Sequence, residues 1–319
     1  MNLEDLGWGE PFASAFAASN LDGCAPARVI AVHRGHLVVA GAQGEALAVV
    51  AGRTRERATI GDWVVVDARG AVSARLPRRS VLARAGQDLA ANVAVAFVVT
   101  SANRDLNPRR LERFVAVAAA GGCAPVLVLN KADLVTDPEP SLAVMRAVAP
   151  GVPVVATSAQ RGDGVDALAA QLGRGRTGAL IGSSGVGKST LVNALLGNER
   201  QATAEIRARD DRGRHTTTNR ALFALPHGAG LLVDTPGLRL PRMSADPAGV
   251  AAAFADVDEL AAGCRFSDCR HETEPGCAVR AAIAAGELDP ARLRHRSKLE
   301  GEQRWAATRR GAPAARPPR

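Results

Sequence analysis

The sequence predicts an α/β protein in which a parallel sheet is preceded by a small β-barrel and followed by a mainly helical segment. Short strand-like runs fill residues 28–84. From about residue 87, apolar β-branched runs alternate with helical stretches, and after about residue 243 Ala-rich helical stretches surround a Cys/His cluster. Strands that are buried on both faces and joined by helices are typical of a parallel α/β sheet. A chain of 319 residues is long enough for two or three such domains.

Composition restricts the class of protein. Hydrophobic residues make up 47% and charged residues 23%, which is typical of globular chains rather than of disordered or fibrous ones. No apolar run reaches the roughly 18 residues of a membrane-spanning helix. The first residues, MNLEDLGWGEPF, carry acids but no Lys or Arg, unlike a secretory signal. We therefore expect neither a membrane protein nor a secreted one.

The N-terminal part predicts a small closed barrel. Residues 1–24 lack a clear periodicity and are expected to form a loose or weakly helical extension. Five short apolar runs then follow within sixty residues, separated by glycines and polar turns. The basic residues and histidines of these loops are candidates for contacts with nucleic acid, although none is convincing alone: His33, Arg34, His36, Arg53, Arg55 and Arg57.

The α/β part contains a glycine-rich loop between a strand-like run at 177–181 and a helical run at 189–196. This is the setting that a P-loop requires, because its glycines let backbone N–H groups face phosphate oxygens at a helix N-terminus. Lys188 would reach the β- and γ-phosphates, and Ser189 would bind Mg²⁺. The candidate phosphate-binding residues are Gly182, Ser183, Ser184, Gly185, Val186, Gly187, Lys188, Ser189 and Thr190.

A second motif follows the apolar run 230–233. It is the sequence DTPG, in which Asp234 can hold the Mg²⁺ shell and the Gly237 N–H can sense a γ-phosphate. The same four residues also occur in ordinary turns, and only together with a P-loop do they indicate a nucleotide site.

Two further motifs select the base. Asn130, Lys131, Ala132 and Asp133 follow one strand-like run, and Thr157, Ser158 and Ala159 follow another. An Asp carboxylate accepts hydrogen bonds from guanine N1–H and the exocyclic amine, whereas adenine offers no such donor pair. Asn130 would support the guanine and the loop, and a backbone N–H near Ala159 would meet O6. The set predicts GTP rather than ATP.

The order of these motifs is unusual. An ordinary GTPase begins with the P-loop, whereas this chain runs NKAD, TSA, P-loop, threonines and DTPG. A circularly permuted sheet assembles the same site, because chain ends that lie close together tolerate such rewiring. With the preceding barrel and the following Cys/His cluster, this order resembles the bacterial ribosome small subunit-dependent GTPase A family over about residues 25–300. The resemblance implies an OB-fold barrel, a circularly permuted P-loop GTPase domain and a zinc-binding domain, acting in late maturation of the small ribosomal subunit.

The catalytic group is sought between the P-loop and the DTPG motif. Residues 212–218 (RGRHTTT) lie where the first switch is expected, and one of the threonines would complete the Mg²⁺ shell; spacing does not choose among them, and Thr217 is our candidate. Leu238 follows Gly237, so the Gln that commonly orients the attacking water is missing there. His215 is the best local candidate, and the resemblance places a catalytic histidine in this motif. The alternative is that His215 is a solvated loop residue.

Five cysteines argue against a complete disulfide framework and favour a reducing, cytoplasmic setting. Cys24 and Cys123 stand alone and are interpreted as small buried hydrophobes. Cys264, Cys269, His271 and Cys277 offer three thiolates and one imidazole, the ligand set of one closed structural Zn²⁺ site. A disulfide is the alternative, and it would leave one cysteine of the cluster over.

The C-terminal end is strongly basic. Residues 291–319 hold nine Lys and Arg against two Glu, so seven of the chain's eight net positive charges lie there. The end either binds RNA phosphates or is a solvated tail, and the barrel and zinc segment shift the balance toward ribosomal RNA. Trp305 would either stack on a base or pack against its helix. The expected division is an extension (1–24), an OB-fold barrel (25–86), a permuted GTPase domain (87–242), a zinc-binding domain (243–300) and a basic tail (301–319).

The leading interpretation of function is hydrolysis of GTP to GDP and phosphate, stimulated by the small ribosomal subunit and driving release from it. One alternative is an RNA-docking assembly module for which GTP is mainly a structural ligand, and another is a GTPase that acts on a different ribosomal RNA target. The expected partners are GTP or GDP with Mg²⁺, the small subunit and its rRNA, with no membrane. We expect a cytoplasmic monomer.

Overall fold

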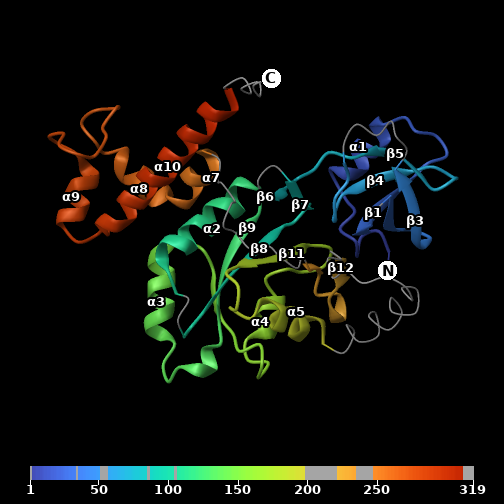
Figure 1. Cartoon of the computed structure of the whole chain (residues 1–319), viewed down its shortest axis with the longest axis horizontal. Coiled ribbons are helices and arrows are strands. Elements are labelled where there is room, and N and C mark those ends of the chain that lie inside the picture. Colours follow the sequence, from blue (N-terminus) through green and yellow to red (C-terminus); the bar gives the residue numbers. More distant parts are fainter. Residues whose placement is uncertain are drawn as a thin grey trace, which may run out of the picture.

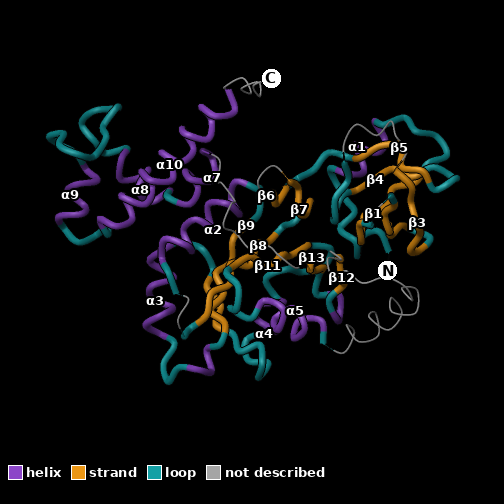
Figure 2. Tube along the Cα trace, in the orientation of Figure 1, coloured by secondary structure: helices purple, strands orange, loops and turns teal. Residues whose placement is uncertain are grey.

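The computed structural model describes residues 2–33, 35–50, 57–84, 87–103, 106–197, 221–234 and 247–311. Within these ranges the chain forms a β-barrel, an α/β body and a helical module, with the α/β body between the other two (Figure 1). Figure 2 shows that strands dominate the barrel and the centre of the molecule, whereas helices and loops build the C-terminal module. The predicted architecture of three unlike parts is confirmed.

The barrel has five strands: β1 (Ala25–Val32), β2 (His36–Gly41), β3 (Gly44–Val50), β4 (Trp63–Val66) and β5 (Ala71–Arg75). They pair in the order β1-β2-β3-β5-β4, and β4 pairs again with β1, so the sheet closes on itself. Every pairing is antiparallel except β3 with β5. Alternate residues such as Val29, Val39 and Val64 point inward and form a small core of their own.

The predicted loop candidates of the barrel are only partly within the described residues. His33 and His36 stack on each other with ring centroids 4.9 Å apart. Arg57 is described, whereas Arg34, Arg53 and Arg55 lie outside the described residues.

The N-terminal segment is not loose. It forms a helix, α1 (Phe12–Ala18), and Leu6 and Phe12 are buried. Trp8 meets Trp63 of the barrel edge-on, with ring centroids 4.7 Å apart. Aromatic residues are scarce in this chain, and several of them gather here because the barrel end needs an apolar cover.

The α/β sheet has the order β10-β9-β8-β11-β13-β12. Five strands are parallel and β12 is antiparallel. The bounds are β8 (Val95–Ser101), β9 (Ala124–Asn130), β10 (Val154–Ala156), β11 (Thr177–Gly182), β12 (Ala221–Ala224) and β13 (Leu231–Asp234). Each residue of β8 and β11 is buried, as expected for strands covered on both faces.

Helices cover both faces of this sheet. Side chains of α2 (Pro108–Ala120) and α3 (Glu139–Val148) belong to one core, and those of α4 (Val165–Ala169) and α5 (Lys188–Leu196) to the other. Short 3₁₀ turns lie at Ala132–Leu134 (η1) and Pro226–Gly228 (η2). The barrel joins the sheet through a pairing of Ala31 with Ala221. Cys123 is buried, and burial raises the pKa of its thiol to about 12, which agrees with its interpretation as an inert apolar residue.

A hairpin that the sequence analysis did not predict connects the barrel to the α/β body. Its strands are β6 (Val81–Arg84) and β7 (Gln87–Ala91). The expected division at 86/87 falls inside this hairpin, and the expected division at 300/301 falls inside one continuous helix, α10 (Pro290–Gly311). The division of the chain into domains therefore stays a proposal.

The C-terminal module consists of α7 (Pro247–Ala253), α8 (Ala255–Ala261), α9 (Ala278–Ala284) and α10. Helix α7 lies directly on α2 of the α/β body. A Cβ atom on Gly249 would lie 2.3 Å from the carbonyl oxygen of Ala116 and 2.5 Å from the Cβ of Ala120, so only glycine permits this approach. Among the described residues no helix is both long and apolar enough to cross a lipid bilayer.

The close contact of α7 with α2 predicts that one added methyl group at Gly249 destabilises the fold. We expect Gly249→Ala to lower the free energy of unfolding by ~1–3 kcal/mol, because the added methyl group must push two helices apart. Gly301 is the matched control, since a Cβ there meets nothing within 4 Å and its helix should gain ~0.5–1 kcal/mol from alanine. Urea unfolding of both variants measures the difference, and equal effects at the two positions would contradict the close approach.

Candidate functional site

The P-loop lies where the sequence analysis placed it, between β11 and α5. Gly182, Gly185 and Gly187 all have positive φ, at 154°, 84° and 92°. A Cβ atom on Gly182 would lie 2.3 Å from the carbonyl oxygen of Val99, and one on Gly187 would lie 2.3 Å from the side-chain nitrogen of Asn130. All three glycines are therefore favoured by backbone conformation, and Gly182 and Gly187 are also required by the close approach of Val99 and Asn130.

Lys188 opens α5 and folds back over the loop. Its ammonium donates to the carbonyl oxygens of Gly182, at 2.9 Å, and Ser183. The charge thus lies at the loop that would hold the phosphates, as expected for a P-loop lysine. Ser184, Ser189 and Thr190 are exposed around it, so their hydroxyl groups are available to a ligand.

Asn130 joins three motifs that are far apart in the sequence. It is 1% exposed, and its amide nitrogen donates to the carbonyl oxygen of Val186 at 2.8 Å. Its amide oxygen accepts from the Ala159 N–H at 3.1 Å and from the Thr157 hydroxyl at 3.2 Å. One side chain therefore holds the P-loop and the TSA segment against the end of β9.

The expected base-binding residues surround a cavity of about 220 Å³. Lys131 has a left-handed backbone (φ 61°), and its ammonium donates to the carbonyl oxygen of Gly185 at 2.7 Å. Asp133 lies on η1 and is partly exposed. The wall includes Leu134 and Gln160, which the sequence analysis missed because neither belongs to a motif. The lining residues are Asn130, Lys131, Asp133, Leu134, Ala159, Gln160, Gly187 and Thr190.

Asp234 ends β13, which runs parallel to β11 and beside it. The carboxyl ends of parallel neighbours meet at one edge of a sheet, so Asp234 and the P-loop share that edge. Ser189 and Asp234 offer the hydroxyl and carboxylate oxygens that Mg²⁺ prefers, and the chemistry of this donor set fits the ion. Gly237, His215 and Thr217 lie outside the described residues.

An arginine that the sequence analysis missed contacts the P-loop from α2. Arg110 donates to the hydroxyl group of Ser183 at 2.7 Å. Its helix begins at Pro108 and is capped by Asn107, whose side chain accepts from the Arg110 N–H at 3.2 Å. The cap and the proline set the start of the helix, which positions this guanidinium beside the loop.

Two residues further along α2, Glu112 anchors the C-terminal module. Its buried carboxylate accepts from Arg292 of α10 at 3.0 Å and contacts His295. Arg292 also pairs with Asp256 at 2.6 Å and lies 4.7 Å from the ring centre of Phe254. The same helix therefore contacts the P-loop through Arg110 and the C-terminal module through Glu112, two residues further along.

The cysteine and histidine cluster is assembled as predicted. The ligand atoms of Cys264, Cys269, His271 and Cys277 all lie within 4.8 Å of one another. Neighbouring pairs are 3.4 Å (His271 Nδ1 to Cys277 Sγ) and 3.9 Å (Cys264 Sγ to Cys277 Sγ) apart. Tetrahedral ligands at ~2.3 Å from an ion are themselves about 3.8 Å apart, so three sulfur atoms and one nitrogen fit a metal ion such as zinc.

The cluster holds no disulfide, since all five cysteines are free. Glu274, which the sequence analysis missed, shapes the loop between its ligands. The carboxylate accepts from the N–H groups of Arg270, Glu272 and Thr273 at 2.9–3.0 Å, and these bonds lower its pKa to about 2. The loop is thus held by a charged group that is not itself one of the candidate ligands.

Comparison with known proteins agrees with this geometry. The RsgA GTPase family model matches residues 75–244. Over 97% of its length the chain is 47% identical to the small ribosomal subunit biogenesis GTPase RsgA of Opitutus terrae, of which it covers 92%. The chain belongs to the RsgA GTPase family. A second relative of the same name, from Xylella fastidiosa, is 47% identical over 96% of the chain and 98% of that protein.

Solved structures give the same fold. YjeQ from Thermotoga maritima superposes with a TM-score of 0.69 at 26% identity, over 88% of this chain and 98% of that one. YloQ, described as a circularly permuted GTPase, has a TM-score of 0.66 at 22% identity, over 90% and 97%. The predicted permuted GTPase fold, the family and GTP hydrolase activity are confirmed.

The base cavity predicts a change of specificity. We expect Asp133→Asn to weaken GTP binding by about 10–100-fold, because a mismatched hydrogen-bond pair costs ~1–3 kcal/mol. The same variant should gain xanthosine triphosphate, whose C2 carbonyl accepts from the new amide. Titration with fluorescent nucleotides measures both, and unchanged GTP affinity would count against this assignment of Asp133.

The contact of Arg110 with Ser183 predicts a role in nucleotide binding. Arg110→Ala should weaken GTP and GDP by roughly threefold to tenfold, since one net hydrogen bond of ~0.5–1.5 kcal/mol to the loop is lost. Arg109→Ala removes the same charge from the preceding, exposed position and is the matched control. Equal losses in the two variants would show a general charge effect rather than a positioned contact.

Proposed function

We propose that this RsgA-family GTPase binds the small ribosomal subunit during late maturation and leaves it after subunit-stimulated hydrolysis of GTP. The observation that carries the proposal is the assembly of the NKAD, TSA and P-loop segments around one cavity through Asn130. The names of relatives that match almost the whole chain supply the macromolecular partner.

The residues of the site have separate tasks in this proposal. Backbone N–H groups of the P-loop and the Lys188 ammonium bind the phosphates, and Asp133 selects guanine. Ser189 and Asp234 would hold Mg²⁺, which would supply neutralisation of phosphate charge when bound. Thr217 and Gly237 would complete this side of the site, and His215 would orient the attacking water.

The C-terminal module would dock on RNA in a form that one structural zinc ion holds in shape. The four candidate ligands have no open position for chemistry, which favours a structural ion. The basic residues of 291–319, together with the barrel, would supply contacts with rRNA phosphates. A monomer acting in the cytoplasm remains our proposal for the assembly state and the compartment.

Turnover separates this proposal from the alternative of an RNA-docking module with GTP as a structural ligand. Purified small subunits should raise the rate of phosphate release, whereas the alternative expects no increase. Co-sedimentation with small and large subunits in a non-hydrolysable GTP analogue tests the choice of target, and binding to the large subunit alone would overturn the proposal.

The proposed role of His215 predicts a specific kinetic defect. His215→Ala should lower subunit-stimulated kcat by about a hundredfold or more while GTP affinity stays within a factor of two or so, because the lost interaction is made only in the transition state. Single-turnover hydrolysis and nucleotide titration separate the two quantities. Survival of stimulated turnover would mean that another residue or the ribosome positions the water.

The module's position predicts that zinc matters for docking rather than for nucleotide binding. Cys269→Ser should weaken small-subunit binding and remove most of the stimulation, while basal GTP affinity changes little, because no candidate zinc ligand lines the base cavity. Metal content, subunit co-sedimentation and GTP titration are measured on the same preparation. A metal-free, folded variant with full stimulation would show that the coupling does not use this module.

A further inference from the structure

A second cavity lies at the N-terminal end of β11, at the opposite end of this strand from the P-loop. It has a volume of about 470 Å³ and is bounded by the N-terminal segment, the barrel and the α/β body. β11 runs from this cavity, at Thr177, to the P-loop, at Gly182. Five residue steps of a strand span about 17 Å, so a ligand in this cavity would not touch the nucleotide.

Arg28 lines the cavity, and its buried guanidinium makes no ion pair with a carboxylate among the described residues. It is 2% exposed, and its hydrogen bonds within the described ranges go to neutral oxygen atoms. The acceptors are the carbonyl oxygens of Leu6, Gly61 and Asn92 and the hydroxyl group of Thr177, the last at 2.7 Å. Burial lowers the pKa of Arg28 to about 10, which leaves the guanidinium charged at neutral pH.

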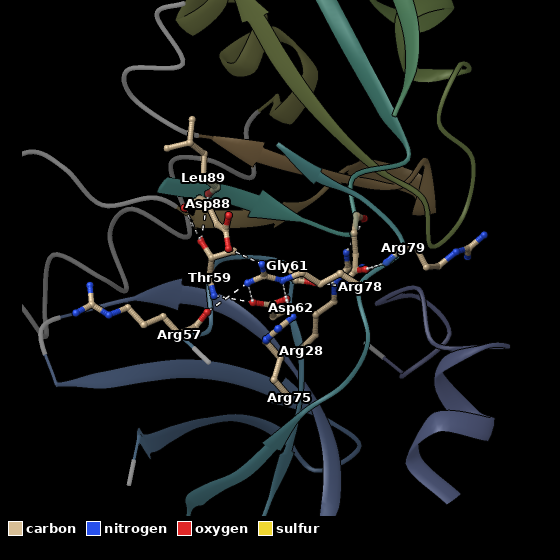
Figure 3. A network of polar contacts seen from close by, with 11 residues as sticks. Arg28, Arg57, Thr59, Gly61, Asp62, Arg75, Arg78, Arg79, Asp88 and Leu89 are labelled. Atoms are coloured by element: carbon tan, nitrogen blue, oxygen red, sulfur yellow. Dashed lines mark hydrogen bonds and ion pairs between the residues drawn. The ribbon is translucent and has the colours of Figure 1, made fainter. Parts of the chain in front are cut away.

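The nearest relevant carboxylate is already engaged by other arginines. Asp62 accepts from Arg78 at 2.7 and 2.8 Å, and Arg75 lies 3.8 Å from it (Figure 3). A bidentate pair of this kind uses both carboxylate oxygens. Asp62 therefore acts on Arg28 only through space and does not neutralise it by contact.

Two more arginines line the same cavity from other segments. Arg79 precedes β6, Arg176 precedes β11, and both are exposed. Within the part of the chain that the structure describes, neither side chain makes a hydrogen bond or ion pair. Figure 3 shows that Arg79 extends away from the Asp62 cluster. Three like charges without a bound carboxylate give the cavity a positive potential that an anion would relieve.

We propose that this cavity is a second anion site, which binds a phosphate group carried by a small molecule or by the end of a nucleic-acid strand. Planar guanidinium groups match phosphate oxygens in pairs. Because Arg28 lies below the surface, the group must enter the cavity, which favours a free or terminal phosphate over a phosphate within a chain. The volume lies in the range of pockets for small ligands and exceeds what inorganic phosphate alone fills.

The test uses the full-length protein saturated with GDP and Mg²⁺, so that the P-loop is already filled. Titration with inorganic phosphate, followed by calorimetry or ³¹P NMR, should show one saturable site. Arg79→Ala/Arg176→Ala should weaken it by about tenfold or more, because two charge-assisted contacts are lost. Arg146→Ala removes one exposed charge on α3, away from the cavity, and should leave binding unchanged.

A pair of short oligonucleotides, with and without a 5′-phosphate, distinguishes the two sources. If the wild-type protein binds the 5′-phosphorylated strand more tightly and the double variant loses this preference, the ligand is the end of a nucleic-acid strand. If the two strands bind equally well but the double variant still binds inorganic phosphate more weakly than the wild type, the ligand is a small molecule. Arg28→Met should abolish the binding of phosphate and of the phosphorylated strand. If Arg28→Met does not fold, the double variant of the exposed Arg79 and Arg176 still tests the proposal. The proposal is overturned if GDP-filled protein shows no saturable phosphate binding, or if the double variant binds as the wild type does.

Discussion

The buried amide of Asn130 is the interaction on which the nucleotide site depends. An unpaired amide inside a protein costs free energy, so this side chain requires partners for both its ends. It finds them in the P-loop, through Val186, and in the TSA segment, through Ala159 and Thr157. The three segments are separated by long stretches of chain. Their relative position is set by the hydrogen bonds that the Asn130 amide makes to them. The base cavity exists because these hydrogen bonds hold its walls together.

Ion pairs that each include at least one buried charged group connect parts of the chain that are distant in sequence. At the barrel, Arg78 pairs with Asp62 and Asp88, and these carboxylates raise the pKa of its guanidinium (Figure 3). At the C-terminal module, Arg292 pairs with Glu112 and Asp256. Removal of one partner would leave a buried charge uncompensated, which is more costly than the pair is stabilising. Such contacts specify orientation, whereas the apolar cores supply most of the stability.

Helix α2 has a special position in this arrangement. Its first turn contacts the P-loop through Arg110, and its buried face contacts α7 and α10. The close approach at Gly249 leaves little room for α7 to slide along α2. Helix α2 therefore connects the C-terminal module to the phosphate loop by direct contacts at both.

The candidate site could be predicted from the sequence. Residue type and spacing are enough to recognise the glycines and lysine of the P-loop, the Asn and Asp of the NKAD segment and the four zinc-ligand candidates. Each of these local motifs carries its chemistry in a short stretch of sequence. The permuted order followed from the same motifs, and the barrel followed from short alternating strands. The tertiary structure alone decided the roles of Arg110, Leu134 and Gln160, whose neighbours come from distant segments. It also decided the docking of residues 2–24, the hairpin β6–β7 and the unneutralised charge of Arg28. No local pattern predicts these features, since each depends on which parts of the chain meet across a packed interface.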